Sequence, residues 1–408
     1  MRYRIAVATL LLVVLVCAGF AAPARAQSDA PAPFAGILVR FQPALSRAEI
    51  DQALAAQGLQ AVEYQSDLKV YRAQAQRGAN LAAVLIALKA EARVVLAEPN
   101  YIVRAVEARP AHLPLFLPTA ASGANDPLYH DQWGLQRIQA ARAWPAVGGR
   151  MVTIAIIDSG VELTHPDLRA RIVRGYNFVI PGAPPQDDLG HGTHVAGIAA
   201  AIQNNHVGVA GTATGVQILP LKILDASGYG TIANLALAMR YAVRRNARVI
   251  SLSLGTGEVN QCPTVLQEAA DFAYSRGTLV VAAAGNLGEG APFFPAACNH
   301  VMSVNSTDYT DRLSYFSNFS DWVSISAPGE DILSTVPGAT YDYNSGTSMA
   351  TPFVAGTAAM LYLKNPSAPP DQIEQEIEFT ADRFPWMSGA TGYGGGRLNA
   401  GRAVAGER

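Results

Sequence analysis

From Asp126 onward, short runs of consecutive apolar residues alternate with helical stretches, and this alternation constrains the fold more than any other feature of the sequence. The runs are Val152–Ile157, Val216–Leu221, Val249–Leu254, Thr278–Ala283, Val301–Val304 and Val323–Ser326. A strand that is apolar on both faces must be covered on both faces, and helices between successive strands provide that cover. The sequence therefore predicts an α/β fold with a parallel central sheet and helices on both faces. In such sheets, ligands bind beyond the carboxyl ends of the strands.

A smaller module precedes this pattern. The elements expected in residues 34–105 are a strand at Ile37–Phe41, a helix at Ser46–Gln57, a short strand near Val70, a helix at Gly78–Ala92 and a closing strand that ends "VVLAEPNYIVRA". This order predicts a small α+β module of the β-α-β-β-α-β, ferredoxin-like type. Residues 106–122 are rich in proline and alanine, show little pattern and are interpreted as a linker, so that residues 123–408 form the large domain.

The N-terminal residues 1–26 are typical of a secretory signal peptide, with two arginines, a long apolar run and a small-x-small sequence that ends at Ala26. We expect cleavage after Ala26 and a secreted protein. The alternative is a retained membrane anchor, because the apolar run is nearly as long as a membrane span. The exported chain keeps Cys262 and Cys298, which in an oxidising compartment are a candidate disulfide.

The composition restricts the possible partners. The formal net charge is −2 and only 15% of the residues are charged, so the chain offers no broad basic field for nucleic acid. We expect no nucleic-acid partner and a monomeric protein.

Three polar residues follow predicted strands or precede predicted helices, with glycine beside each. They are Asp158 in "AIIDSGV", His191 in "DDLGHGTHVAG" and Ser348 in "NSGTSMATPFVAG". Singly, the acid and the serine are explained as turn or cap residues, and the pair His191 and His194 as core packing or a metal site. Together, an acid, a histidine and a serine supply the orienting group, the base and the nucleophile of serine acyl transfer.

The three motifs, with "VVAAAGN", resemble those of the subtilisin-like serine proteases, most closely the thermitase-like branch, over about residues 123–403. The resemblance implies a serine endopeptidase with a subtilisin-like fold. It also implies that Asp158 orients the imidazole, that His191 is the general base and acid, and that Ser348 attacks the peptide carbonyl. His194 would then pack against the sheet.

The resemblance further implies how the reaction is stabilised. Asn286 matches the family's side-chain donor to the developing oxyanion, beside the N–H of Ser348 at the start of a helix. We expect Pro352 to lie in the first turn of that helix, where few N–H groups are needed.

Substrate is expected to be an extended polypeptide, because backbone hydrogen bonds are common to all peptides. The edge segments that match the family are Ser253, Leu254 and Gly255 on one side and Gly228, Tyr229 and Gly230 on the other. The walls of the pocket for the residue before the scissile bond are expected to be Leu254, Ala283, Ala284 and Gly285. Phe293 matches the pocket floor. Its ring either shortens the pocket or turns outward beside Phe294 and leaves the pocket deep.

A structural Ca²⁺ ion is also implied. The side-chain ligands that match the family are Asp126, Asp167 and Asn205, and the carbonyl ligands are Ile202, Val207 and Val209. Carboxylate, amide and carbonyl oxygens suit this hard cation. The alternative is a hydrated loop without a metal ion.

The module at residues 34–105 resembles the subtilisin propeptide, especially through "AEPNY". It would act as a folding template and intramolecular inhibitor, with the processing site between Ala105 and Gly123.

Two other functions are alternatives to the protease: a catalytically silent binding protein of the same fold, and a metal hydrolase that uses His191 and His194.

Overall fold

The computed structural model describes residues 34–75, 79–106, 123–146, 151–384 and 392–407. The predicted signal segment at 1–26 lies outside these residues, as does the predicted linker after Val106. Within the described residues, we find no helix whose length and apolar character would let it cross a membrane.

The large domain is built on a seven-stranded parallel sheet with the strand order β13-β12-β11-β9-β5-β7-β6. Its strands are β5 (Val152–Asp158), β6 (Tyr176–Asn177), β7 (Val216–Lys222), β9 (Val249–Leu252), β11 (Leu279–Ala283), β12 (Val301–Thr307) and β13 (Ile325–Pro328). The predicted α/β class and the parallel sheet are confirmed.

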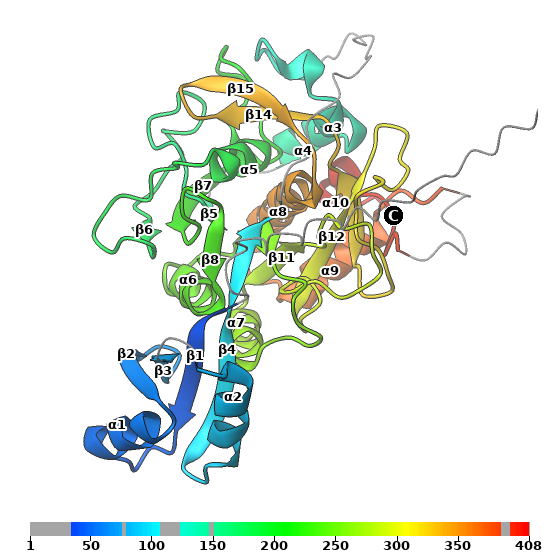
Figure 1. The fold of residues 1–408 in the computed structure, drawn as a ribbon. Helices are drawn as coiled ribbons and strands as arrows, with labels where there is room; N and C mark the ends of the chain where they lie inside the picture. The colour runs from blue at the N-terminus through cyan, green and yellow to red at the C-terminus, as the bar shows by residue number, and fades with distance from the viewer. Residues whose placement is uncertain (1–33, 76–78, 107–122, 147–150, 385–391, 408) are drawn as a thin grey trace, which may run out of the picture. The chain divides into compact units, whose positions relative to one another are not determined.

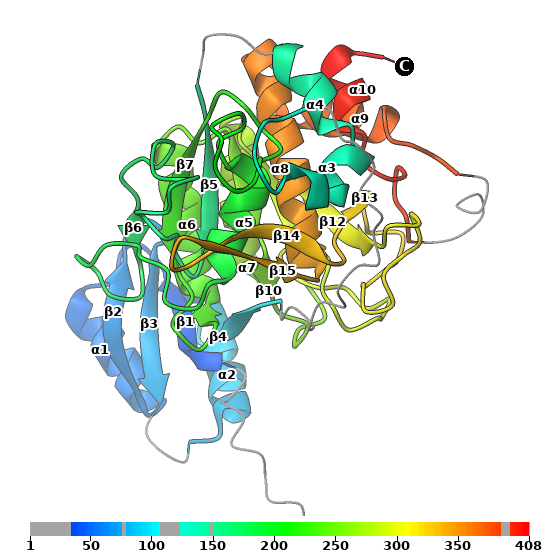
Figure 2. The same ribbon diagram turned by 90° about the horizontal axis from the view of Figure 1, so that it is seen from above.

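Helices cover both faces of this sheet (Figures 1 and 2). They are α5 (His191–Ala200) and α8 (Thr347–Lys364) on one face, and α6 (Ile232–Arg244) and α7 (Thr264–Ser275) on the other. The strand β5 shows why a continuous apolar run is needed. Its Ile154 and Ile156 pack in the core with α5 and α8, whereas Ala155 and Ile157 pack in the core with α6 and α7.

The remaining helices and the hairpin complete the large domain. They are α3 (Trp133–Arg137), α4 (Ala140–Ala143), α9 (Pro370–Phe379), α10 (Ala400–Ala405), and the antiparallel pair β14 (Ile332–Val336) and β15 (Thr340–Asn344). The hairpin packs against α5 and was not predicted. Cys262 and Cys298 form a disulfide with Cα atoms 5.3 Å apart, so the predicted pairing is confirmed.

The module before the large domain follows the predicted order of elements. It consists of β1 (Phe34–Phe41), α1 (Arg47–Ala56), β2 (Leu59–Gln65), β3 (Val70–Ala75), α2 (Leu81–Ala90) and β4 (Val94–Ala105), with the antiparallel strand order β4-β1-β3-β2. A capping box formed by Ser46 and Glu49 begins α1. Sequence patterning did not place β2, because most of its side chains are exposed or half-buried.

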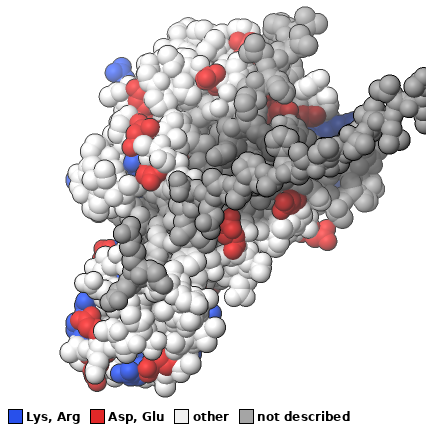
Figure 3. All heavy atoms as spheres, in the orientation of Figure 1, with Lys and Arg blue, Asp and Glu red and all other residues white. Residues whose placement is uncertain are grey.

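The strand β4 continues beyond its own module into the large domain (Figure 1). It pairs with β8 (Tyr229–Thr231) on one side and β10 (Leu254–Gly255) on the other. The sequence had placed Leu254 in one run with Val249, but at Ser253 the chain leaves the parallel sheet to pair with β4. On the face drawn in Figure 3, acidic and basic side chains are interspersed among uncharged ones.

Candidate active site

Asp158 and His191 meet beyond the carboxyl end of β5. Asp158 is the last residue of this strand, and His191 is the first residue of α5. His191 Nδ1 lies 2.8 Å from Asp158 Oδ1, and the same oxygen accepts the main-chain N–H of Ser159 at 2.7 Å. Asp158 is fully buried. The acid therefore fixes one ring nitrogen of the histidine and leaves the other nitrogen for chemistry.

The two histidines of α5 differ in their electrostatic surroundings. Burial lowers the pKa of His191, but the charges of Asp158 and Asp187 outweigh that effect, and the pKa is raised above its usual value. Burial lowers the pKa of His194 to about 4. His194 Nε2 lies 3.1 Å from the carbonyl oxygen of Asp342 in β15, so this ring packs under the hairpin. The prediction that His194 packs in the interior is confirmed, and its ring nitrogen bonds to the hairpin.

Ser348 lies in the first turn of α8, whose N-cap is Gly346. Its hydroxyl is 3.0 Å from the carbonyl oxygen of Ser253 and 3.2 Å from that of Val106. His191 Nε2 is buried and has no hydrogen-bond partner among the described residues. A buried serine hydroxyl and a buried, unengaged imidazole nitrogen are thus both present.

The expected position of Pro352 is wrong. Because α8 begins at Thr347, Pro352 is its sixth residue and lies beyond the first turn. At that position a proline cannot donate an N–H to the carbonyl of Ser348. The carbonyl oxygen of Ser348 instead accepts the hydroxyl of Ser253 at 2.8 Å. The proline therefore frees a carbonyl that joins α8 to the edge segment containing Ser253.

Asn286 lies beside the start of α8. Its Oδ1 accepts the main-chain N–H and the hydroxyl of Thr347, each at 2.9 Å. These two bonds fix the orientation of the amide and turn its NH₂ group away from Thr347. A Cβ atom on Gly346 would lie 2.8 Å from that nitrogen, so any side chain at position 346 would clash with the amide.

The two predicted edge segments enclose a strand of the same chain. In β4, Arg104 pairs with Tyr229 and Val103 with Gly230. On the other side, Ala105 pairs with Leu254, and Arg104 also pairs with Gly255. The N–H of Ala105 donates to Gly228 at 3.0 Å, and that of Val106 to Ser253 at 3.4 Å. The segments therefore form a cleft that holds an extended peptide through main-chain hydrogen bonds.

Val106 occupies the predicted pocket. It is buried and forms one apolar cluster with Ala283 and Phe293. Of the other predicted wall residues, Ala284 and Gly285 are buried just after β11, and Leu254 is buried in the cluster on the side of α6 and α7. Phe294 belongs to a different cluster, on the side of α6 and α7. Cβ atoms on Gly255 and Gly285 would lie 2.4 Å and 3.0 Å from the ring of Phe293, so this ring fills the space between the two walls.

The residues predicted to bind calcium also come together. Asn205 Nδ2 donates to Asp167 Oδ1 at 2.7 Å, and the N–H of Asn205 donates to Asp126 Oδ1 at 3.1 Å. Three main-chain N–H groups of the loop also donate to these residues. The acceptors are Asp167 Oδ2 for Val209, Asn205 Oδ1 for Val207 and the carbonyl oxygen of Asp167 for Ile202. Burial, opposed in part by hydrogen bonds from Asn204 and Asn205, raises the pKa of Asp126, and the charge of Asp167 raises it further.

These groups have the donors that a calcium ion requires. Two buried carboxylates lie close together, and among the described residues neither has an ion pair at contact distance, although the charge of Arg171 acts on both. A divalent cation would neutralise them. Within the part of the chain that the structure describes, no three His, Cys, Asp or Glu side chains gather around one point. The predicted donor set has only two acids, and its other members are the Asn205 amide and three main-chain carbonyls.

Two groups at the site were not predicted. Val106 was assigned to the linker, because the apolar pattern of β4 ends at Ala105. Asp187 is buried next to His191, and its only signal in the sequence was the pair of acids in "QDDLG".

Comparison with known proteins agrees with this geometry. Residues 149–396 match the subtilase family. Thermitase of Thermoactinomyces vulgaris is 47% identical over 281 residues, which cover 69% of this chain and 98% of that protein. A thermophilic serine proteinase of Bacillus sp. (strain AK1) is 40% identical over 371 residues, which cover 90% of this chain and 86% of that protein. Fervidolysin from Fervidobacterium pennivorans, a keratinolytic enzyme related to subtilisin, is 30% identical in a solved structure with a TM-score of 0.77, covering 90% of this chain and 60% of that one.

Proposed function

The chain belongs to the subtilase family and is a serine protease that hydrolyses proteins, and on that premise we propose that it is a secreted endopeptidase made as a self-processed zymogen. Secretion is supported by the signal-like residues 1–26 and by the disulfide between Cys262 and Cys298. The single observation that carries the proposal is the position of Ser348 between the carbonyl of Val106 and the cleft residue Ser253.

The proposed reaction is acyl transfer through Ser348. Its Oγ forms a bond to the peptide carbonyl carbon while His191 Nε2 takes the hydroxyl proton. Asp158 holds the Nδ1 side of the ring and stabilises the imidazolium. The C–N bond of the peptide then breaks, and His191 returns the proton to the leaving amine. A water molecule repeats the sequence at the acyl carbon and regenerates the serine.

The tetrahedral intermediate carries a negative charge on the former carbonyl oxygen. We assign its two donors as the main-chain N–H of Ser348 and the NH₂ group of Asn286. The dipole of α8 favours negative charge at its N-terminus, and Thr347 holds the Asn286 amide in a fixed orientation. Donors that are oriented before the reaction stabilise the transition state without reorganisation.

The module at residues 34–105 is proposed to be the propeptide. Its last strand fills the cleft between β8 and β10 as a substrate strand would, and Val106 occupies the pocket formed by Ala283 and Phe293. Cleavage is therefore assigned to the bond between Val106 and Glu107. The proposal also assigns substrate binding to Ser253–Gly255 and Gly228–Gly230, because these segments already bond to the main chain of β4.

The same module completes two helices of the large domain. Glu98 accepts the N–H groups of Thr264 and Val265 at 2.8 Å and 3.0 Å, at the start of α7, where the N-cap Pro263 offers no side-chain cap. Asn100 accepts the N–H of Ala233 at 3.0 Å, near the start of α6. Hydrogen bonds from the module to these main-chain amides would stabilise the starts of α6 and α7 while the large domain folds. They therefore support a folding role for the propeptide.

A structural calcium ion is part of the proposal. Asp126, Asp167 and Asn205 would hold it with side-chain oxygens, and Ile202, Val207 and Val209 with carbonyl oxygens. When bound, the ion neutralises two buried carboxylates and fastens the loop at residues 202–209 to the rest of the domain. It takes no part in the hydrolysis.

A serine-directed organophosphate tests the proposed function. The reagent is expected to abolish casein cleavage by the mature enzyme and to add its mass to the peptide that contains Ser348. The control variant Ser345→Ala removes a neighbouring hydroxyl that bonds to Asp331, and it should still be labelled. Cleavage that persists in the presence of the reagent would favour a metal hydrolase, and a folded protein that cleaves nothing would favour a silent binding protein.

A further inference from the structure

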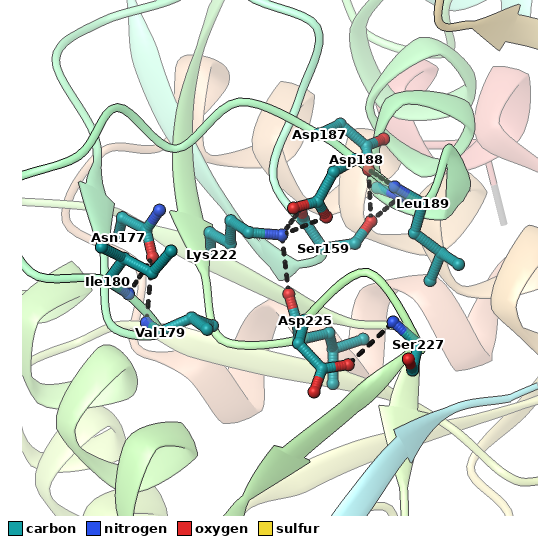
Figure 4. A network of polar contacts seen from close by, with 12 residues as sticks. Ser159, Asn177, Val179, Ile180, Asp187, Asp188, Leu189, Lys222, Asp225 and Ser227 are labelled. Carbon is teal, nitrogen blue, oxygen red and sulfur yellow. Dashed lines mark hydrogen bonds and ion pairs between the residues drawn. The ribbon is translucent and has the colours of Figure 1, made fainter.

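Asp187 has a buried carboxylate that accepts an unusual number of hydrogen bonds (Figure 4). Its Oδ1 accepts the hydroxyl of Ser159 at 2.8 Å and the N–H groups of Leu189 and Gly190 at 3.0 Å and 2.9 Å. Its Oδ2 accepts both the N–H and the hydroxyl of Thr193. Through these bonds one side chain fixes the turn before α5 and the first turn of that helix.

Ser159 connects this carboxylate to the neighbours of His191. Its hydroxyl accepts the N–H of Gly192 at 2.9 Å, and its own N–H donates to Asp158 Oδ1 at 2.7 Å. The same Asp158 oxygen lies 2.8 Å from His191 Nδ1. Since the N-cap Gly190 has no side chain, Asp187 and Ser159 together satisfy the first-turn amides that a capping side chain would otherwise bind.

The negative charge of Asp187 is not cancelled by a cation in direct contact. The nearby ammonium of Lys222 donates to Asp188 at 2.6 Å and to the carbonyl oxygens of Ser159 and Leu224 at 2.7 Å and 2.8 Å (Figure 4). Within the described residues, Asp187 has no ion pair. The charge therefore remains to act on its surroundings, in a buried site where screening by solvent is weak.

Among the residues that the structure describes, few other charged groups lie near His191. Asp158 faces it from the end of β5, and Lys222 at the end of β7 is paired with Asp188 in the loop before α5. His194 on the same helix is neutral above pH 4, where burial has lowered its pKa. The cavity beside His191 is also lined by Arg104 of β4 and Asp342 of β15. From α8, the only basic residue is Lys364, at the far end of the helix.

From this arrangement we propose that Asp187 is a positioning residue for His191: it anchors the first turn of α5 through Ser159 and Thr193 and adds a second negative charge that stabilises the imidazolium. The inference rests on the roles proposed above for Asp158, His191 and Ser348. It extends them, because the serine mechanism needs only one carboxylate at the histidine.

The test is the pH dependence of kcat/KM for Asp187→Asn in the mature enzyme, from which Arg104 has departed with the propeptide. The base must be neutral to act, so activity falls as the pH drops through the pKa of His191. Loss of the Asp187 charge lowers that pKa, and the midpoint of the acid limb should move to lower pH by roughly half a unit to one unit. We expect kcat to fall roughly tenfold and KM to change less than twofold, since the substrate cleft is untouched.

Two matched variants separate charge from geometry. Ser159→Ala breaks the link to Gly192 but keeps the carboxylate, so kcat should fall while the acid limb stays in place. Asp188→Asn removes a carboxylate that is half exposed and paired with Lys222. The midpoint of the acid limb should therefore move by no more than roughly 0.3 of a pH unit. If Asp187→Asn does not mature, NMR titration of the His191 ring in uncut Ser348→Ala chains, with and without Asp187→Asn, supplies the shift in midpoint, because Arg104 is present in both.

The outcomes are distinguishable. An unshifted midpoint in Asp187→Asn, by kinetics or by NMR, overturns the role of the Asp187 charge even where proteolysis still requires Ser348. Proteolysis that persists in Ser348→Ala would instead overturn the proposed function itself.

Discussion

The hydroxyl of Ser348 lies 3.2 Å from the main-chain carbonyl oxygen of Val106, a residue 242 positions earlier in the sequence. The side chain of Val106 packs against Ala283 and Phe293, and its N–H bonds to Ser253. One short segment thus fills the pocket, bonds to the cleft and presents its carbonyl to the serine. This relationship supports both the proposed cleavage site and the proposed depth of the pocket.

The first prediction concerns Asn286. Replacement by alanine removes the NH₂ group assigned to the developing oxyanion, together with the Oδ1 bonds to Thr347, so kcat should fall by roughly 10²–10³, the scale known for loss of one such donor in subtilisin, with KM little changed. Steady-state kinetics on a peptide amide gives both constants. A rise in KM as large as the fall in kcat would show that Asn286 binds the ground state instead.

The second prediction concerns the pocket floor. Because the ring of Phe293 fills the space between Gly255 and Gly285, the pocket should prefer small and medium side chains, as Val106 illustrates. In Phe293→Gly, kcat/KM for a peptide with Phe before the scissile bond should rise relative to one with Ala, by roughly ten- to two hundredfold. Phe294→Leu, a change in a different apolar cluster, should leave the ratio unaltered. No rise in Phe293→Gly would mean that Phe293 is not the floor.

The third prediction is the effect of removing calcium. A ligand that binds only the native state adds RT ln(1 + [L]/Kd), about 2.7 kcal/mol at one hundred times Kd. A strong chelator should therefore shorten the half-life of the mature enzyme at elevated temperature before it changes the initial rate. Asp126→Asn should already be labile and should respond less to the chelator. Equal half-lives of the wild-type enzyme with and without chelator would contradict the site.

The fourth prediction is the acid limb of the wild-type pH profile. Asp158 and Asp187 raise the pKa of His191 above its usual 6.5 against the opposing effect of burial. The base is lost as the pH falls through that raised pKa, so the midpoint of kcat/KM should lie above 6.5. His194, with a pKa of about 4, contributes nothing in this range, and His194→Gln should leave the midpoint in place. If the midpoint moves in His194→Gln, the acid limb reports the titration of His194 and not that of His191.

The parts of the structure that follow from local pattern could be predicted from the sequence. The continuous apolar run of β5 indicated a strand covered on both faces, and the motifs around Asp158, His191 and Ser348 identified residues that the fold brings to one edge of the sheet. The pairing of β4 with β8 and β10 could not be predicted from local pattern. Nothing in the sequence near Val106 shows that it meets Ser253 and Ser348, since those contacts depend on the finished cleft.

Residues that look alike in the sequence differ in burial in the structure, and the sequence does not predict this difference. Asp187 and Asp188 are adjacent acids, yet one is buried among five hydrogen-bond donors and the other is half exposed and paired with Lys222. The hairpin of β14 and β15 was missed because β15 is mostly half-buried or exposed and shows little apolar alternation.

The most direct measurement is the intact mass of the purified chain after folding, for the wild type and for Ser348→Ala. We predict that the wild type separates into two fragments whose masses place the first cut between Val106 and Glu107, and that Ser348→Ala remains one uncut chain. A Ser348→Ala chain cut at that bond in the absence of other proteases would contradict the proposal that Ser348 performs the hydrolysis.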